Sequence, residues 1–228
     1  KYLCPRQLHS VHSSHAKFDS IKRRGYFPNL ARDKSGSVYK TTLIVKMLCV
    51  VANKLASLDP FGTGIEMEAD KPNWFDALNG LPGLFGSSAC ETAELERWIK
   101  FILNAVKETG TKYLDIILPA ELYDFISGLA VLLKENLASG AKNKDFVYWD
   151  KSNALKEEYR EKVKISFSGQ EKDFTLPQLR AFLEMAEIKA ARAILLAHSK
   201  NSGLACSYFI NEVVEYEFLF DNNKKKTD

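Results

Sequence analysis

Residues 91–110 read ETAELERWIKFILNAVKETG and carry a clear helical pattern. Four apolar residues recur at intervals of three and four, and therefore share one face of a helix: Leu95, Trp98, Ile102 and Ala105. Glu91 and Glu94 fall in the first turn, where negative charge suits the helix dipole, and Gly110 follows the last turn. The stretch predicts a helix that buries one face in a core.

Helical patterns recur on both sides of this stretch. Residues 41–59 are almost continuously apolar and predict a buried helix that ends before Pro60. Pro119 is predicted to open a third helix, because proline is favoured in the first turn. Two more helices are predicted, one from about Asp150 and one over residues 176–199.

Strand signals are few. Residues 164–176 predict either a short hairpin or a bulging loop, and residues 206–220 mix aromatic and β-branched residues in an extended pattern. Residues 60–90 predict a long loop. Four or five helices joined by sizeable loops predict a mainly α fold, in which helical hairpins form an (α/α) toroid or part of one.

The length and the amino-acid composition are typical of a folded protein with one domain or two small ones. The chain has 228 residues, of which 46% are hydrophobic and 27% charged, with a net charge of +3. Residues 1–46 hold ten Lys and Arg against two Asp and Glu, whereas residues 59–135 hold six against thirteen. We predict a basic irregular segment at 1–40 packed on a helical domain at 41–220, with a polar tail at 221–228.

Cysteine usage and hydropathy indicate the cellular compartment that we expect for the chain. The four cysteines stand singly, which is typical of reduced thiols in a cytoplasmic protein. No run reaches the roughly 18 uncharged apolar residues of a membrane span, so no membrane partner is expected. The chain opens without Met, at KYLCPRQLHS, which predicts a piece of a larger parent chain whose remainder is a partner.

Residues 73–88, NWFDALNGLPGLFGSS, hold one acid among aromatic and turn-forming residues. Apolar neighbours such as Trp74 and Phe75 raise the pKa of a carboxyl group, so Asp76 is predicted to carry a proton near neutral pH, as a general acid requires. The aromatic rings can stack on the apolar face of a sugar, while Asn79 can bind its hydroxyl groups. The alternative is a tight loop whose aromatic side chains fill a core while Asp76 caps a turn.

Residues 73–103 resemble the W-N-D-G-[LM]-N segment of cellobiose and chitobiose phosphorylases, which is followed by a Glu that opens a helix. The resemblance implies an (α/α)6 barrel, an inverting reaction with Asp76 as general acid, and a substrate site that includes Trp74, Asn79 and Glu91. Phe75 and Ala77 stand where the phosphorylases have Asn and Gly.

Three stretches of the chain also resemble large bacterial proteins related to cellobiose phosphorylase. They are RGYFPNLARDKSG at 24–36, EMEADKPNWFDALNGLPGLFGSS at 66–88 and YFINEVVEYE at 208–217.

The mechanism implied is a single displacement in which Asp76 protonates the leaving glycosidic oxygen. Either phosphate attacks the anomeric carbon, or a second carboxylate, roughly 6.5–9.5 Å from the first, activates water. Candidates for the second carboxylate are Glu66, Glu68, Glu212 and Glu215. Glu66 and Glu68 point to one side of an extended segment and could both line a cleft, although solvated loop acids would look the same.

Three histidines follow one another at intervals of three in RQLHSVHSSH, residues 6–15. No carboxylate or thiolate stands at ligand spacing, so a metal is not predicted. We expect Arg6 and His9 instead to donate hydrogen bonds to a sugar or an oxyanion. Inorganic phosphate is the co-substrate expected if the enzyme is a phosphorylase, and no cofactor is expected. Nucleic acid is not expected as a partner, because the net charge is modest.

These patterns predict an enzyme of carbohydrate metabolism, a glycoside phosphorylase or an inverting glycoside hydrolase, acting on a disaccharide or oligosaccharide. The alternative from another class is a non-enzymatic helical module whose aromatic loop binds carbohydrate or a partner domain.

Overall fold

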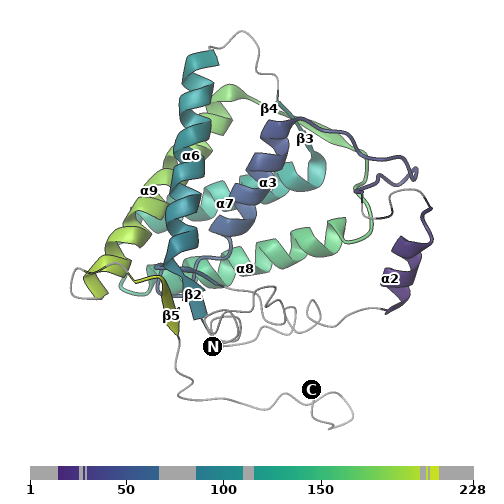
Figure 1. Cartoon of the computed structure of the whole chain (residues 1–228). Coiled ribbons are helices and arrows are strands. Elements are labelled where there is room, and N and C mark those ends of the chain that lie inside the picture. The colour runs from purple at the N-terminus through teal and green to yellow at the C-terminus, as the bar shows by residue number, and fades with distance from the viewer. Residues whose placement is uncertain are drawn as a thin grey trace.

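The computed structural model describes residues 15–25, 28, 30–66, 86–109, 116–200, 204 and 206–210. These residues are mainly helical, which confirms the predicted class (Figure 1). The helices are α2 (His15–Lys22), α3 (Leu43–Leu55), α6 (Ala89–Thr109), α7 (Ala120–Ala138), α8 (Lys144–Val163) and α9 (Leu176–Lys200). The strands are β1 (Ile65–Glu66), β2 (Gly86–Ser88), β3 (Ile116–Pro119), β4 (Glu171–Phe174) and β5 (Tyr208–Ile210).

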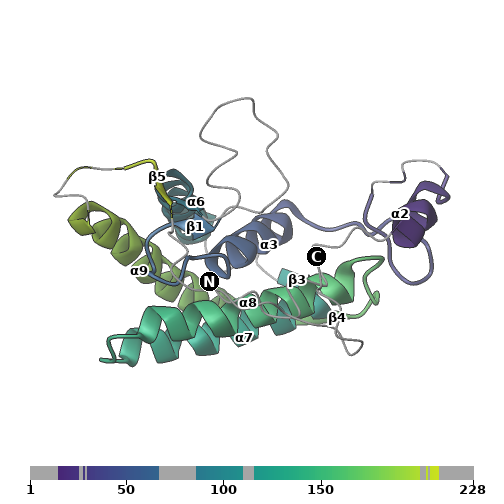
Figure 2. The ribbon, with the colours of Figure 1, turned by 90° about the horizontal axis from the view of Figure 1, so that it is seen from below.

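The longer helices pack in pairs. Helix α8 returns along α7, and α9 runs back along α6 (Figure 1). Seen from below, α7 and α8 lie side by side along one edge, with α3, α6 and α9 above them (Figure 2). Helix α3 contacts both α6 and α7, so it lies between the two pairs. The main core is therefore enclosed by α3 together with the two helical pairs.

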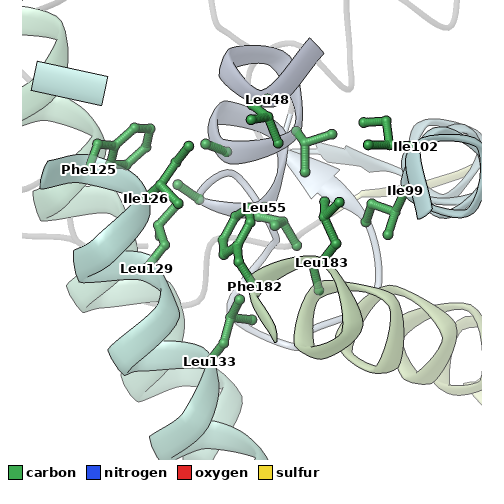
Figure 3. Packing of buried hydrophobic residues seen from close by; sticks show 14 of the residues in the cluster. Leu48, Leu55, Ile99, Ile102, Phe125, Ile126, Leu129, Leu133, Phe182 and Leu183 are labelled. Atoms are coloured by element: carbon green, nitrogen blue, oxygen red, sulfur yellow. The ribbon is translucent and has the colours of Figure 1, made fainter. Parts of the chain in front are cut away.

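Side chains from α3, α6, α7 and α9 meet in this core (Figure 3), and Tyr148 and Tyr159 of α8 join them. Leu48 and Leu55 of α3 are fully buried, as the nearly continuous apolar pattern of that helix requires. Phe182 of α9 and Leu129 of α7 extend the cluster on one side, and Ile99 of α6 extends it on the other. The helical patterns in the sequence thus supply most of the core, although Trp98, predicted on the buried face of its helix, is exposed.

The strands form two small antiparallel sheets. One has the order β1-β2-β5, and the other pairs β3 with β4. In β3, Ile116 and Leu118 are buried while Ile117 between them is exposed, which is the alternation expected of a half-buried strand. The segment 164–176 thus supplies a strand to a distant partner and does not form a hairpin within itself.

One additional helix and one helix start differ from expectation. Part of the segment 1–40, predicted to be irregular, forms the short helix α2. Helix α8 begins at Lys144 and not near Asp150. Its first turn is held by contacts to other helices: the Lys144 carbonyl accepts a hydrogen bond from Asn136, and Asp145 pairs with two cations of α9. Such tertiary contacts override a weak local helical signal.

Residues 30–40 contact the segment between α8 and β4. Asp33 forms an isolated bridge with Phe167, whose backbone N–H donates to the Arg32 carbonyl at 2.8 Å. The Tyr39 hydroxyl donates to Glu171 at 2.8 Å, and its ring lies 5.0 Å from that of Phe167. Among the described helices, none is both long and apolar enough to cross a membrane.

Candidate functional site

The acidic motif lies in a segment whose two ends are held together. Strands β1 and β2 pair antiparallel, with Ile65 opposite Ser88 and Glu66 opposite Ser87. Residues 67–85, which carry Asp76, lie outside the described residues. Because Glu66 precedes this segment and Ser87 follows it, the segment starts and ends at the same edge of the sheet. The predicted acid Glu66 therefore stands at the base of the motif segment.

The buried carboxylate of Asp59 holds together the two ends of the motif segment. Asp59 is 1% exposed and accepts hydrogen bonds from five donors. They are Phe61 N at 3.1 Å, Thr63 N at 2.8 Å, Thr63 Oγ1 at 2.6 Å, Gly64 N at 3.0 Å and Ser87 Oγ at 2.7 Å. These donors occupy both carboxylate oxygens, so Asp59 organises the turn 59–64 and ties it to β2. Its role is structural, since little acceptor capacity is left for a ligand.

Side-chain hydroxyl groups hold the start of α6 in place through hydrogen bonds to the backbone. The Ser88 hydroxyl accepts a hydrogen bond from the Glu91 backbone N–H at 3.2 Å, which caps the first turn. The Thr92 hydroxyl is buried between the carbonyl groups of Ser88, at 3.2 Å, and Thr63, at 3.3 Å. Glu91 lies in the first turn of α6, as predicted, and its carboxylate pairs with Lys54 at the end of α3.

Gly64 allows the turn 59–64 to approach β2 closely. A Cβ atom at this position would lie 2.7 Å from the Ser87 hydroxyl and 2.9 Å from its Cβ. We expect Gly64→Ala to lower the free energy of unfolding by about 1–3 kcal/mol through overpacking. Gly140→Ala is the matched control, because nothing lies within 4 Å of its added methyl group. Urea unfolding of both variants tests this, and equal stabilities would show that the turn gives way freely.

The remaining predicted site residues fall outside the described residues: Arg6, His9, Glu68, Trp74, Phe75, Asp76, Asn79 and Glu212. Of the predicted set, Glu66 and Glu91 are described. Glu66 is partly buried, and its backbone N–H donates to the Ser57 carbonyl at 2.7 Å. Both glutamates lie on elements that flank the motif segment, one before it and one after it.

Helix α8 carries a buried polar face that was not predicted from the sequence. Trp149, Asn153 and Glu157 follow one another at intervals of four and are 3%, 4% and 7% exposed. Side chains four residues apart lie on the same face of a helix. We call these three residues the α8 polar face. The spacing W-x3-N-x3-E is visible in the sequence, but Asn and Glu side chains on a helix are usually solvated, so residue type alone does not predict this burial.

Helix α8 contacts the stretch that leads into the motif segment. Lys156, on the same helix, donates from Nζ to the Ser57 hydroxyl at 3.0 Å, and Ser57 also accepts the backbone hydrogen bond of Glu66. The Tyr148 hydroxyl donates to the Leu55 carbonyl at 3.3 Å. Helix α8 therefore packs along the stretch that leads from α3 into β1.

A second polar cluster joins α7, α8 and α9. Lys189 is 1% exposed and donates from Nζ to Asp145 Oδ1 at 2.6 Å and to Asn136 Oδ1 at 3.0 Å. Arg192 pairs with the same carboxylate at 2.8 Å, and Lys189 Nζ lies 4.5 Å from the centre of the Tyr148 ring. We call these five residues the Asp145–Lys189 cluster.

The protonation of this cluster follows from its contacts. Burial lowers the pKa of Lys189, and the neighbouring Asp145 opposes that shift. Burial acts to raise the pKa of Asp145, but the hydrogen bonds and charges of Lys189 and Arg192 outweigh it and hold the pKa below its ordinary value. Both charges are met by partners at hydrogen-bond distance. The Asp145–Lys189 cluster therefore serves to join the helices.

No group of three or more His, Cys, Asp or Glu residues within the described ranges is arranged to hold a metal ion. Comparison with known proteins finds no matching family model and no significantly similar curated protein.

Proposed function

We propose that this chain is a carbohydrate-active catalytic domain, or part of one, that cleaves a glycosidic bond by an inverting single displacement. Asp76 is the general acid, and Trp74, Phe75 and Asn79 form the sugar subsite. The helical hairpins belong to an (α/α)6 toroid. The proposal is supported by the likeness of residues 73–103 to the phosphorylase motif and by the mainly helical fold.

The observation that carries the proposal is the pairing of β1 with β2. A loop that delivers a catalytic acid must have fixed ends, because a displacement of about 1 Å can cost a hundredfold in rate. The hydrogen bonds of Asp59 and the cap at Ser88 supply such ends. Glu66 stands beside them with its backbone fixed to Ser57.

In the proposed reaction Asp76 protonates the leaving oxygen while a nucleophile attacks the anomeric carbon from the opposite face. In a phosphorylase the nucleophile is phosphate, for which Arg6 and His9 are the proposed donors. In a hydrolase it is water, activated by Glu66, Glu68 or Glu212. Glu91 contributes by orienting the site, and its pairing with Lys54 favours this role over direct contact with substrate.

The test is a turnover screen of the chain, and of any longer natural protein that contains it, against β-linked disaccharides with and without phosphate. The readout is free monosaccharide against sugar phosphate. Turnover that requires phosphate supports a phosphorylase, and turnover without phosphate supports a hydrolase. Sugar binding with no turnover under either condition would favour the non-enzymatic binding module.

A further inference from the structure

Four large apolar side chains of α3 and α6 are exposed. Leu43 and Val50 of α3 are 73% and 46% exposed, and Trp98 and Phe101 of α6 are 38% and 62% exposed. Single exposed apolar residues are common on protein surfaces, but a group of them on adjoining elements is typical of a docking surface. We call these four residues the α3–α6 apolar surface.

An ion pair shows that these side chains lie on facing stripes of the two helices. Lys54 of α3 pairs with Glu91 of α6, and the two helices lie side by side (Figure 1). The exposed residues of α3 lie four and eleven residues before Lys54, and those of α6 lie seven and ten residues after Glu91. Such intervals keep residues on one side of a helix, so both stripes continue from the ion pair as apolar surface.

The motif segment, residues 67–85, starts and ends beside this ion pair. Glu66, just before the segment, donates its backbone N–H to Ser57, and Ser88, just after it, caps Glu91 in the first turn of α6. The middle of a 19-residue segment can extend about 30 Å from its ends. Phe101 lies only about 15 Å along α6 from Glu91, so the segment is long enough to cover the surface.

The composition of the motif segment matches the α3–α6 apolar surface. Seven of its 19 residues are Leu, Met, Phe or Trp, and four are charged. Residues 211–228 leave the same sheet after β5, but eight of these 18 residues are charged. The charges also agree, because α3 carries two lysines and no acid, whereas the motif segment carries three acids and one lysine. The motif segment is therefore the better occupant.

We propose that the α3–α6 apolar surface is the docking surface of the motif segment. The leucines within 78–84 supply the apolar contact, because the aromatic pair 74–75 belongs to the sugar subsite. Docking then makes Phe101 a positioning residue for Asp76, and this consequence alone rests on the proposed function.

Photo-crosslinking from position 101 tests the docking. The variant Phe101→p-benzoylphenylalanine keeps an aromatic ring and reacts on irradiation with the residues that lie against it. We expect an intramolecular crosslink to a residue within 67–85, identified by digestion and mass spectrometry. The same replacement at Val131 is the control, because Val131 is exposed on α7 and that helix contacts α3 through its buried face. We expect no crosslink to 67–85 from position 131.

The other possible occupants of the surface give different crosslinks. A crosslink to a second copy of the chain, seen as a dimer on a denaturing gel, would overturn the proposal and assign the surface to self-association. A crosslink to residues 1–14 or 211–228 would also overturn it. Absence of any crosslink from position 101 would show a solvated surface, with the same consequence.

Hydrogen exchange of Phe101→Lys provides an independent test. A lysine at this position places a charge against the leucines, so we expect the backbone amides of 67–85 to exchange about fivefold faster or more. Exchange in the core helices should not change, because Phe101 lies outside the core cluster. Val131→Lys is the matched control and should leave exchange in 67–85 as it is in the unmodified chain. Equal exchange of 67–85 in Phe101→Lys and in the control would overturn the proposal.

Turnover separates this inference from the proposed function. If the crosslink to 67–85 forms while no disaccharide is cleaved, the docking stands and the catalytic proposal fails. If disaccharides are cleaved and no such crosslink forms, the catalytic proposal stands and the docking fails.

Discussion

Replacement of Asp145 by alanine is expected to lower the free energy of unfolding by about 3–5 kcal/mol, the usual cost of leaving a buried charge without its partner. Asp145 is the carboxylate that meets both Lys189, which is almost fully buried, and Arg192. Its removal leaves the Lys189 ammonium with Asn136 and the Tyr148 ring, which carry no formal charge. Urea unfolding measures the loss.

Asp150→Ala is the matched control for this prediction, since Asp150 is exposed on the same helix. We expect it to change the free energy of unfolding by less than about 0.5 kcal/mol. The double variant Asp145→Leu with Lys189→Met should recover much of the loss, because an apolar pair of similar volume often replaces a buried ion pair at little cost. If Asp145→Ala were as stable as the control, the Asp145–Lys189 cluster would not hold the helices together.

The pH dependence of the loss has a definite sign. The pKa of Asp145 is lower in the folded chain than in the unfolded chain, so the pair contributes stability above the ordinary carboxyl pKa of about 4. That contribution disappears as the pH falls through the folded-state pKa. The difference between the unmodified chain and Asp145→Ala should therefore shrink in acid and stay constant between about pH 5 and pH 8.

The sequence predicted the elements whose apolar spacing is strong. In helix α6 the predicted Leu95 and Ile102 are buried, with Ile99 beside them, whereas Trp98 of the predicted face is 38% exposed. Strands β1 and β2 were not predicted, because two or three residues are too few to show an alternation. They form because Asp59 accepts hydrogen bonds both from the turn 59–64 and from Ser87, a long-range arrangement that no local pattern contains.

The candidate site was predictable to a similar extent. The position of Glu91 in the first turn of α6 followed from the local sequence, but its pairing with Lys54 depends on how α3 packs against α6. The α8 polar face was not predicted, because its burial also depends on packing. Charged and polar residues on a helix are normally solvated, and the burial of Asn153 and Glu157 is set by tertiary packing that residue type does not reveal.

Replacement of Asp76 by asparagine is expected to reduce turnover of an unactivated disaccharide by about 10²–10⁴-fold, the usual contribution of a general acid. The amide keeps the size of the side chain but cannot deliver a proton, so affinity for the disaccharide should change little. Asp70→Asn is the matched control, because Asp70 lies in the same segment but outside the motif. The measurements are kcat from initial rates and affinity from calorimetry.

The leaving group provides the decisive check of the role of Asp76. An aryl glycoside with an acidic phenol departs without protonation, so the variant Asp76→Asn should cleave it at nearly the rate of the unmodified enzyme. A residue that only shapes the loop would impair both substrates equally, because misplacement of the sugar does not depend on the leaving group. Equal losses on the two substrates would therefore remove Asp76 from the chemistry even if the variant were inactive on the disaccharide.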